Sequence, residues 1–476
     1  MYFKETKPRK VAILPKNGVS FFTLMLKIQR ISEFQHSFSF LSFTDQFEGF
    51  YDRFLESDLG KIHQAVPWDD LAKSFGIKEP VKGPDGYFSP KGKIALMFLK
   101  HYAGCSDHKL IEQLNGNIDY QFFCDIHLGL QRLGNPKIVS DIRCELSACL
   151  DIAELEKTLC SHWLPYIEEP EKIVVDATCY ESELRYPTDQ KLLWESVDWL
   201  YRQLKQICKA NGIKVPRSKY LKWKKRYIGY SKMRKKTIKK RRSLTRALLG
   251  LLKKFIDLEK QLGTTYTLGL PKRYHKTMRT IKKVYGQQYL YFTKGEKPNG
   301  RIVSLHKDYV RPIVRGKEIK TVEFGAKVNK VQIDGISFIQ KLSFDNFNEG
   351  TQLKNSVYKA QGLTKAKVKV VGADAIYATN KNRTFVTNEN IQTDFRPKGK
   401  PSKHHKQQKQ LKAAITKERA SRLEGSFGKE KEHYHLKKIK ARTKANEALW
   451  IFFGIHTANA LEIGRRMQRA LQQNVA

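Results

Sequence analysis

Two short apolar runs, far apart in the sequence, each end in an aspartate. Residues 173–175 (IVV) precede Asp176, and residues 370–373 (VVGA) precede Asp374. Runs of this length, rich in β-branched residues and bounded by polar segments, are typical of buried strands. Between them, segment 320–344 holds two strand-like runs joined by Asp334-Gly335, a strong β-hairpin signal. The sequence therefore predicts a sheet with acidic residues at the ends of two strands.

The order of the remaining elements indicates the topology of this sheet. A helix over 348–361 precedes the strand that ends at Asp374, and a short helix near 380–388, a strand in 391–397 and further helices follow it. The order β, β-hairpin, α-β-α-β-α predicts a five-stranded mixed α/β sheet, which is also the order of a ribonuclease H-like core. If the first and fourth strands are parallel neighbours, Asp176 and Asp374 lie at the same sheet edge, where sites in open α/β sheets collect.

The chain divides by composition into four parts. Residues 1–57 give a weak signal and are interpreted as a poorly defined leader, and 58–168 as an all-α N-terminal domain that binds DNA. Pro67 separates two short helices there, and Pro90 stands at the first position of another. Residues 169–193 and 300–476 are predicted to form the catalytic domain. A basic helical insertion over 194–299 separates its two pieces.

Positive charge is concentrated in this insertion. The 476 residues include 89 Lys and Arg but 47 Asp and Glu, a net charge of +42. Residues 201–290 alone hold 28 Lys and Arg and 2 acidic residues. Such a balance is unusual for an enzyme of small anionic metabolites and indicates a polyanionic partner, most commonly nucleic acid. The basic residues expected to bind DNA in the insertion are Lys224, Lys225, Arg226, Lys235, Lys236, Lys239, Lys240, Arg241 and Arg242.

The cysteines and the hydropathy of the sequence indicate the kind of cellular compartment in which the protein is expected. The seven cysteines form no CxxC pair and are irregularly spaced, which argues against a disulfide framework or a zinc ribbon and favours a reducing compartment. Apolar runs such as 19–26 are much shorter than the roughly 20 residues of a bilayer span. The first residues, MYFKETKPRK, do not resemble a signal peptide. We expect a cytoplasmic, nucleoid-associated protein without a membrane partner.

A third acidic residue completes a possible metal site. Glu424 lies in a helix after the last strand, and three carboxylates meeting at the sheet edge would suit Mg²⁺ or Mn²⁺. Lys431 lies two turns beyond Glu424 on the same helix face, where it would hold a phosphate near the metal ions. Each aspartate also has a simpler interpretation, because Asp at a strand end commonly caps the following turn.

Three segments resemble the DDE-type transposases of bacterial insertion sequences. They are VVDAT, VGADAIYATNKNR and SRLEGSFGKEKEHYHLKKIKARTKANEALWIFFGIHTANAL, and the resemblance extends from about residue 58 to the end of the chain. The segment YPTD at 186–189 resembles the subgroup with a long insertion between the two aspartates. The resemblance implies that Asp176, Asp374 and Glu424 are catalytic and bind two Mg²⁺ or Mn²⁺ ions on a ribonuclease H-like fold.

The family signature is only half present. It consists of Tyr, two residues, Arg, three residues, Glu, six residues and Lys. Lys431 matches the final position, but Lys417 and Ala420 stand at the Tyr and Arg positions. Arg419 and Arg422 flank the Arg position and are candidates to replace it as DNA contacts.

The resemblance implies recognition of terminal inverted repeats, metal-dependent cleavage at each end, and attack of the 3′-OH groups on target DNA. Such a reaction on two ends implies double-stranded DNA as the partner and at least a homodimer. Two other hypotheses stay open. One is a ribonuclease H-like nuclease that uses the same three carboxylates without strand transfer. The other is a catalytically decayed, DNA-binding relic of a transposase.

Overall fold

The computed structural model describes residues 43–79, 86–265, 269–314, 322–396 and 405–475. The N-terminal part is helical, as predicted. Its helices are α2 (Phe43–Glu56), α3 (Asp58–Ala65), α4 (Trp68–Ser74), α5 (Pro90–Ala103), α6 (Asp107–Gly116), α7 (Ile118–Phe123), α8 (Lys137–Ala148) and α9 (Ile152–Trp163), followed by the short 3-10 helix η2 (Leu164–Tyr166). Among the helices that the model describes, none has the length and apolarity that crossing a bilayer requires.

Capping residues explain where several of these helices begin. The Ser89 hydroxyl accepts the Gly92 N–H at the start of α5, and Pro90 follows at the first helical position, as predicted. Ser57 and Ser106 cap α3 and α6 in the same way. These side chains satisfy N–H groups that have no partner within the helix. Pro67 lies between α3 and α4 and precedes the first residue of α4.

Helix α2 lies where the sequence predicts a poorly defined leader. Phe47, Tyr51 and Phe54 recur at helical spacing, and all three rings contact the ring of Phe122 in α7. This aromatic contact gives the last part of the expected leader an apolar face and a partner, so residues 43–56 form a helix. Residues 1–42 lie outside the described residues.

The sheet is mixed, which confirms the predicted α/β class. Its strands among the described residues are β1 (Lys172–Ser182), β2 (Pro312–Val314), β3 (Val322–Ile333), β4 (Ile336–Ser343), β5 (Val370–Ala373), β6 (Gln392–Thr393) and β7 (Lys438–Ile439). The path runs β2-β3-β1-β5-β6, while β4 pairs with β3 and β7 pairs with β1. The predicted count of five is therefore too small, because the short strands β2 and β7 also join this sheet.

Strand directions follow from the pairing. β1 and β4 are antiparallel to β3, whereas β5 and β7 are parallel to β1, and β6 is parallel to β5. The predicted hairpin is confirmed, since Ile333 pairs with Ile336 around the turn. Asp334 and Gly335 have φ values of 46° and 81°. Positive φ at both central positions is characteristic of a type I′ turn, whose twist matches that of the strands.

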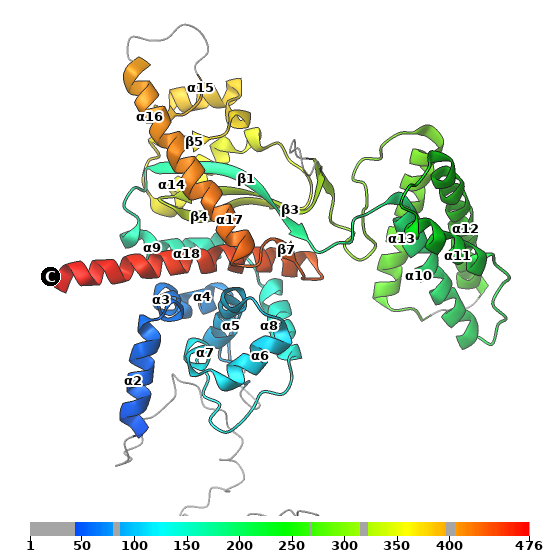
Figure 1. Ribbon diagram of the computed structural model, residues 1–476, viewed down its shortest axis with the longest axis horizontal. Helices are drawn as coiled ribbons and strands as arrows, with labels where there is room; N and C mark the ends of the chain where they lie inside the picture. The colour runs from blue at the N-terminus through cyan, green and yellow to red at the C-terminus, as the bar shows by residue number, and fades with distance from the viewer. Residues whose placement is uncertain (1–42, 80–85, 266–268, 315–321, 397–404, 476) are drawn as a thin grey trace, which may run out of the picture.

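The remaining helices of the sheet-centred body are α14 (Leu353–Thr364), α15 (Asn380–Asn388), α16 (His405–Glu418), α17 (Glu424–Glu432) and α18 (Lys444–Val475), with the 3-10 turns η3 (Glu349–Thr351) and η4 (Ala375–Tyr377). The π-helical segment η5 (Arg419–Leu423) joins α16 to α17. Figure 1 shows α18 between the sheet and the N-terminal helices, while α16 and α17 cross the sheet.

The N-terminal helices share one hydrophobic cluster with the sheet. Phe98 of α5, Val175 of β1 and Phe453 of α18 belong to the same buried group. Helix α18 contacts α3, α5 and α8 on one side and β4 on the other. Burial of this continuous apolar surface stabilises the association of the first 120 or so described residues with the sheet.

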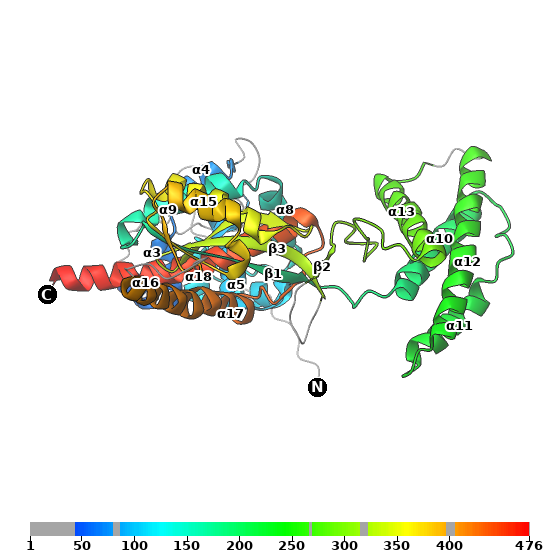
Figure 2. The ribbon, with the colours of Figure 1, turned by 90° about the horizontal axis from the view of Figure 1, so that it is seen from above.

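The charged segment after β1 forms a helical module with a hydrophobic cluster of its own. Its helices are α10 (Asp189–Ala210), α11 (Tyr220–Lys232), α12 (Ile238–Thr265) and α13 (Lys272–Lys294). Leu200, Leu252 and Ile281 lie in its core. The module stands beside the sheet-centred body and is joined to it by two connecting segments (Figures 1 and 2). We keep the name helical module for residues 189–294, and the division of the chain into domains stays a prediction.

Candidate active site

The strand register places the two aspartates side by side. In the parallel pair of β1 and β5, Val175 is opposite Ala373, and the next residue of each strand is the aspartate. Asp374 is exposed and Asp176 is partly buried. The expectation that the two aspartates lie side by side is therefore confirmed for their backbone positions. The expectation that both lie at strand ends is wrong for Asp176, because β1 continues to Ser182 while β5 ends at Ala373.

Both aspartates also make local contacts. Asp176 Oδ1 accepts the N–H of Ala177 at 2.7 Å, and Asp374 Oδ1 accepts the N–H of Ala375 at 2.6 Å. Asp374 is the N-cap of η4. The turn-capping interpretation is thus satisfied for Asp374 but not for Asp176, which lies within β1, and each local contact engages a single carboxylate oxygen. A carboxylate offers more acceptor positions than one hydrogen bond uses.

Helix α17 covers the face of β1 on which Asp176 lies. Side chains of a strand alternate between faces, so Asp176, Thr178 and Tyr180 share one face. Lys431 Nζ donates to Thr178 Oγ1 at 2.9 Å, and the hydroxyl of Tyr180 donates to Glu430. Lys431, the predicted phosphate ligand, therefore contacts the residue two positions after Asp176 in β1, on the same face of the sheet.

A buried lysine anchors this helix. Lys330 is opposite Asp176 in the antiparallel pair of β1 and β3, and its Nζ donates to Glu430 Oε1 at 2.5 Å and to Ser426 Oγ at 3.1 Å. Burial lowers the pKa of the Lys330 ammonium, while Glu430 and Asp176 oppose that shift. The carboxylate of Glu430 is thus occupied by Lys330 and Tyr180. Sequence reasoning missed Lys330, since its signal is only one lysine inside an apolar strand.

Glu424 begins α17 directly after the π-helical segment. Its backbone N–H donates to the carbonyl of Arg419, five residues earlier, and its side chain is exposed. Leu423 before it is completely buried. π-helical turns within α-helices recur at functional sites because the extra residue re-aims the side chains around it. In a regular α-helix the N–H of Glu424 would bond to the carbonyl of Ala420. The extra residue of the π-helical turn makes the carbonyl of Arg419 its partner instead.

Arg419 connects this helix to the strand of Asp374. Its guanidinium lies 3.4 Å from Asp394 Oδ2, and Asp394 Oδ1 accepts the N–H of Ala373 at 3.1 Å. Burial raises the pKa of the Asp394 carboxyl, the Ala373 N–H and Arg419 lower it, and Asp374 raises it further. Asp394 was not among the predicted site residues. It follows the short strand β6, so only the pairing of β6 with β5 brings it to the site.

Arg422 faces another part of the molecule. Its guanidinium donates to Asp334 Oδ1 at 2.9 Å and to Glu418 Oε1 at 3.2 Å. Arg466 of α18 donates to the other Asp334 oxygen at 2.7 Å. Asp334 therefore ties the β3–β4 turn to the π-helical segment and to α18. This gives Arg422 a structural role in addition to the predicted DNA contact, which stays a prediction.

The three predicted metal ligands, Asp176, Asp374 and Glu424, have the side-chain chemistry that binds divalent cations. Only the two aspartates are placed next to each other. Carboxylate oxygens from neighbouring strand ends are ligands that Mg²⁺ and Mn²⁺ prefer. Among the side chains that the model describes, no group of three or more His, Cys, Asp or Glu is arranged to hold a metal ion. Asp176 and Asp374 adjoin by register, whereas Glu424 lies on the covering helix without completing a three-ligand group.

The basic residues predicted in the insertion lie on the surface of the helical module. All nine are exposed, on α11, on the following loop and at the start of α12. Aromatic rings support some of them, since Arg226 lies over Trp223 at 5.1 Å and Lys236 over Tyr230 at 5.5 Å. The described residues include no ion-pair partner for these nine cations. Such a surface is available to phosphates, although the predicted contacts to DNA stay untested.

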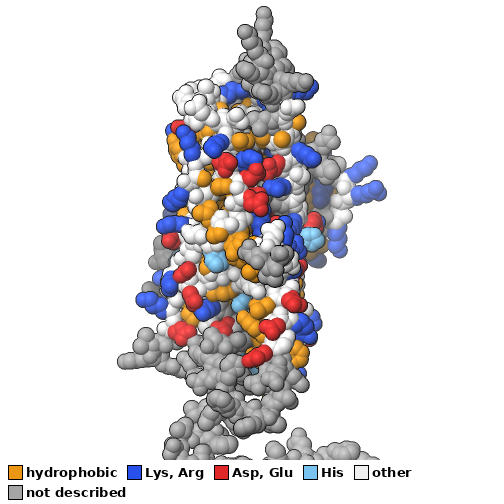
Figure 3. All heavy atoms as spheres, turned by 90° about the vertical axis from the view of Figure 1, so that its left-hand side faces the viewer, with side chains coloured by type: hydrophobic (Ala, Val, Ile, Leu, Met, Phe, Trp, Pro, Cys, Tyr) orange, Lys and Arg blue, Asp and Glu red, His pale blue; other side chains and the backbone are white. Residues whose placement is uncertain are grey.

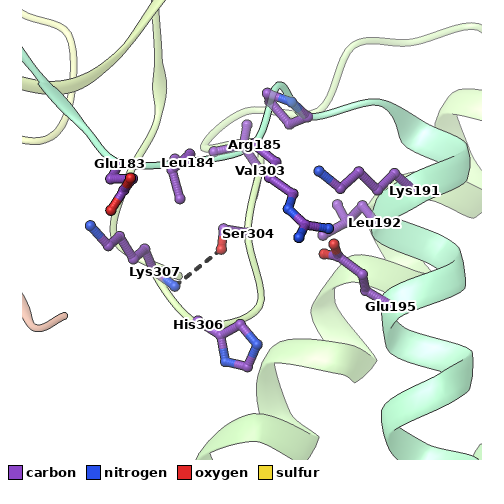
Figure 4. A pocket seen from close by; sticks show the side chains of 11 residues that line it. Glu183, Leu184, Arg185, Lys191, Leu192, Glu195, Val303, Ser304, His306 and Lys307 are labelled. Carbon is purple, nitrogen blue, oxygen red and sulfur yellow. Dashed lines mark hydrogen bonds between the residues drawn. The ribbon is translucent and has the colours of Figure 1, made fainter. Parts of the chain in front are cut away.

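A cavity of about 370 Å³ lies where the helical module joins the body (Figure 4). Arg185 and Lys191 approach Glu195, whose pKa is raised by burial and lowered in part by Lys191, His306 and Arg185. Figure 4 shows the lining side chains on the two connecting segments and α10, and neither Asp176 nor Asp374 lines the cavity. The cations Arg185 and Lys191 thus compensate the charge of Glu195 where the connecting segments meet the helical module.

Comparison with known families matches both parts of the sheet-centred body. A model described as a transposase DDE domain matches residues 371–455, a segment that contains Asp374, Glu424 and Lys431 but not Asp176. A model described as a transposase domain (DUF772) matches residues 50–144, which span α3 to α7 and most of α8. No curated protein and no solved structure matched the chain. The two matched segments pack against each other through α18, and both matches support a DDE-type transposase of an insertion sequence.

Proposed function

We propose that this transposase cleaves DNA at transposon ends and transfers the resulting 3′-OH groups into target DNA, with Asp176, Asp374 and Glu424 as the ligands of two Mg²⁺ or Mn²⁺ ions. The observation that carries the proposal is the pairing of Val175 with Ala373, because it brings two aspartates to one sheet edge. The family match over Asp374 and Glu424 supports it.

The topology supports a ribonuclease H-like core. Leaving out the short strands β2 and β7, the order is β4-β3-β1-β5-β6, with an antiparallel meander on one side of β1 and parallel strands on the other. In this arrangement β1 is central, so the residue that follows its buried apolar run has neighbours on both sides. We assign residues 169–188 and 300–476 to this core and residues 58–168 to a helical part that packs on it.

Metal ions held by these carboxylates would activate the attacking oxygen and stabilise the leaving oxygen of an in-line displacement. The other residues have separate roles in the proposal. Lys431 holds a non-bridging phosphate oxygen, and its hydrogen bond to Thr178 keeps the ammonium group on the face of Asp176. The Lys330–Glu430 pair holds α17 against β1 and β3.

DNA is the proposed partner in both parts of the molecule. The exposed cations of the helical module would contact phosphates without reading sequence. Joining two ends in one reaction would require at least two copies of the chain. The DNA substrate places this activity in the cytoplasm, at the nucleoid.

The test uses the full chain, Mn²⁺ or Mg²⁺, and DNA carrying the inverted repeats that border its gene. We expect end cleavage, joining of precut 3′-OH ends to a target plasmid, and loss of both in Asp176→Asn and Asp374→Asn by roughly 10³-fold or more. Binding of the same DNA in EDTA should persist in both variants. Cleavage that survives both substitutions would refute the assignment of the metal ligands.

Two alternatives give different results in the same assay. A nuclease without strand transfer would cleave the ends but would not join precut 3′-OH ends to the plasmid. A catalytically decayed relic is favoured by one observation, the presence of Ala420 and Lys417 at the Arg and Tyr signature positions. Such a relic would bind DNA in EDTA but would show neither cleavage nor joining in the unmodified chain.

A further inference from the structure

A groove of about 880 Å³ lies between the N-terminal helices and the segment that follows α17. Helices α5, α6 and α8 contribute one wall, and residues 431–443 contribute the other. We name it the basic groove after the Lys and Arg residues that line it, Lys100, Arg143, Lys431, Lys437, Lys438, Lys440 and Arg442. Its two walls thus belong to the two segments that match transposase families.

The segment 438–442 presents its charges in a regular pattern. Lys438, Lys440 and Arg442 are exposed, whereas Ile439 and Ala441 between them are buried. Alternation of this kind arises because successive side chains of an extended segment point to opposite sides. Charges two residues apart are then separated by about 6.6 Å, close to two steps of about 3.4 Å between the phosphates of one DNA strand along the helix axis.

These three cations differ from the others in the groove. Lys100 and Arg143 share Asp107, at 2.7 Å and 2.8 Å, and Lys437 pairs with Glu432 at 2.7 Å. For Lys438, Lys440 and Arg442, the described part of the chain supplies no ion pair. Three like charges on one face of a short segment repel one another, and an anionic ligand would relieve that repulsion.

Contacts between the walls hold the groove open in a defined shape. His101 Nδ1 donates to the carbonyl of Tyr434 at 2.9 Å, and Trp450 Nε1 donates to the carbonyl of His435 at 3.3 Å. Gly104, with φ of 63°, ends α5 against the ring of His435, where a Cβ atom would lie 1.8 Å from Nε2. The glycine permits both the left-handed conformation and this close approach.

The sheet fixes the position of the basic groove relative to the aspartates. Strand β7 continues beside β1, with Glu181 opposite Lys438. Glu181 lies five residues after Asp176 on this strand, a distance of about 16 Å at about 3.3 Å per residue. Lys431, bound to Thr178, lies between the two and also lines the groove. A line of cations therefore leads from Asp176 toward the N-terminal helices.

We propose that the basic groove binds the phosphate backbone of DNA about five nucleotides from the phosphate that reacts at Asp176. This inference rests on the proposed function for the position of the reacting phosphate. The binding itself rests only on the groove. Its contacts are to phosphates, so they set the register of the DNA without reading its sequence.

The pattern has a second interpretation that makes a different prediction. Lysines on edge strands discourage pairing with other chains, and β7 is a short strand at the end of the sheet. If preventing such pairing were the only role of Lys438, Lys440 and Arg442, removing their charges would increase aggregation and leave the affinity for DNA unchanged. Measuring DNA binding in a variant without these charges therefore separates the two interpretations.

The test measures binding of the full chain to a 30-base-pair duplex of arbitrary sequence in EDTA, at several salt concentrations. The variant carries Lys438→Gln, Lys440→Gln and Arg442→Gln. The control carries Lys365→Gln, Lys367→Gln and Lys369→Gln, which are also exposed and spaced by two residues but lie before β5, at the strand end opposite Asp374. A third protein carries Lys438→Arg, Lys440→Arg and Arg442→Lys, which keep the charges.

We expect the slope of log affinity against log salt to fall by about 2.7 in the groove variant, from about 0.9 for each lost contact. The control should bind with the wild-type slope, and the charge-preserving protein should restore it. A wild-type slope in the groove variant, or an equal fall in the control, would overturn the proposal. Retained cleavage in Asp176→Asn would refute the metal assignment but would not affect this result.

Discussion

Three lysines of the sheet-centred body lie inside it and pair with carboxylates, whereas a continuous segment of the helical module exposes its lysines to solvent. Lys330, Lys307 and Lys327 are buried and pair with Glu430, Glu447 and Glu349 at 2.5 Å, 2.5 Å and 2.8 Å. On the module, residues 231–243 are exposed throughout. The side of the body away from the module carries positive and negative side chains interspersed (Figure 3). The comparison teaches that one residue type can be buried in ion pairs in the body and exposed on the module, where we propose that it binds phosphates.

The largest effect is expected at the buried pair. Lys330→Ala leaves the carboxylate of Glu430 buried without its cation, which costs about 3–5 kcal/mol of unfolding free energy. Lys225→Ala on the exposed face of α11 should change it by less than about 0.5 kcal/mol. Urea unfolding of both variants measures the difference. The pair Lys330→Ala with Glu430→Gln should recover part of the loss, and equal values for the two single variants would break the comparison.

The second effect concerns the charges of the module. Replacing Lys235, Lys236, Lys239 and Lys240 by Gln should lower the salt slope of DNA binding by about 3.6, since each phosphate contact contributes about 0.9. The affinity lost between 50 and 200 mM salt then shrinks by a factor of about 100. Fluorescence anisotropy with a labelled duplex measures both quantities, with Lys365, Lys367 and Lys369→Gln as the control. An unchanged slope would show that DNA does not contact this face.

A third prediction concerns the bridge from α16 to β5. Arg419→Ala leaves Asp394 without its cation beside Asp374, and we expect the Mn²⁺ concentration for half-maximal cleavage to rise about 10-fold, within the 10–100-fold range for residues that orient ligands. Asp394→Asn keeps an acceptor for the Ala373 N–H and should have a smaller effect. Arg422→Ala serves as the control on the same turn. Loss of maximal rate without a change in the metal requirement would contradict a positioning role.

The smallest effect is a pH dependence from buried histidines of the body. Burial lowers the pKa of His101 to about 3, while the hydrogen bond to Tyr434 opposes the shift, so the ring is neutral in the folded chain. In the unfolded chain its pKa is about 6.5. Below that value the unfolded state binds more protons, and stability falls as pH drops, by about 1.4 kcal/mol per pH unit for one such group.

Unfolding measurements between pH 6.5 and pH 4 test this slope. His101→Gln should flatten it by the contribution of one histidine, at some cost in stability at pH 7. The exposed His275 of the module provides the matched control, and His275→Gln should leave the slope unchanged because that ring meets solvent before and after unfolding. A slope that stays the same in both variants would show that His101 does not contribute to it.

Local sequence patterns determined much of the secondary structure. The turn at Asp334-Gly335, the first-turn position of Pro90 and the helix at 380–388 all follow from nearest-neighbour chemistry. The strand at 173–175 was also predictable, but its end was not, because β1 continues past Asp176 to Ser182 through its pairing with β3. Turn, cap and periodicity signals act within a few residues, so they can be interpreted without the fold. The side-by-side placement of Asp176 and Asp374 was also predictable, because it follows from the order of the elements.

Tertiary structure alone decided the surroundings of these residues. Lys330 in β3, Thr178 in β1 and Asp394 just after β6 meet η5 and α17 only through strand pairing and helix packing. The basic groove needs α5, α8 and residues 431–443 together, although they are distant in sequence. Burial of a charge and the identity of its partner depend on long-range packing, whereas a lysine in the sequence is the same residue whether it lies in a core or on a surface.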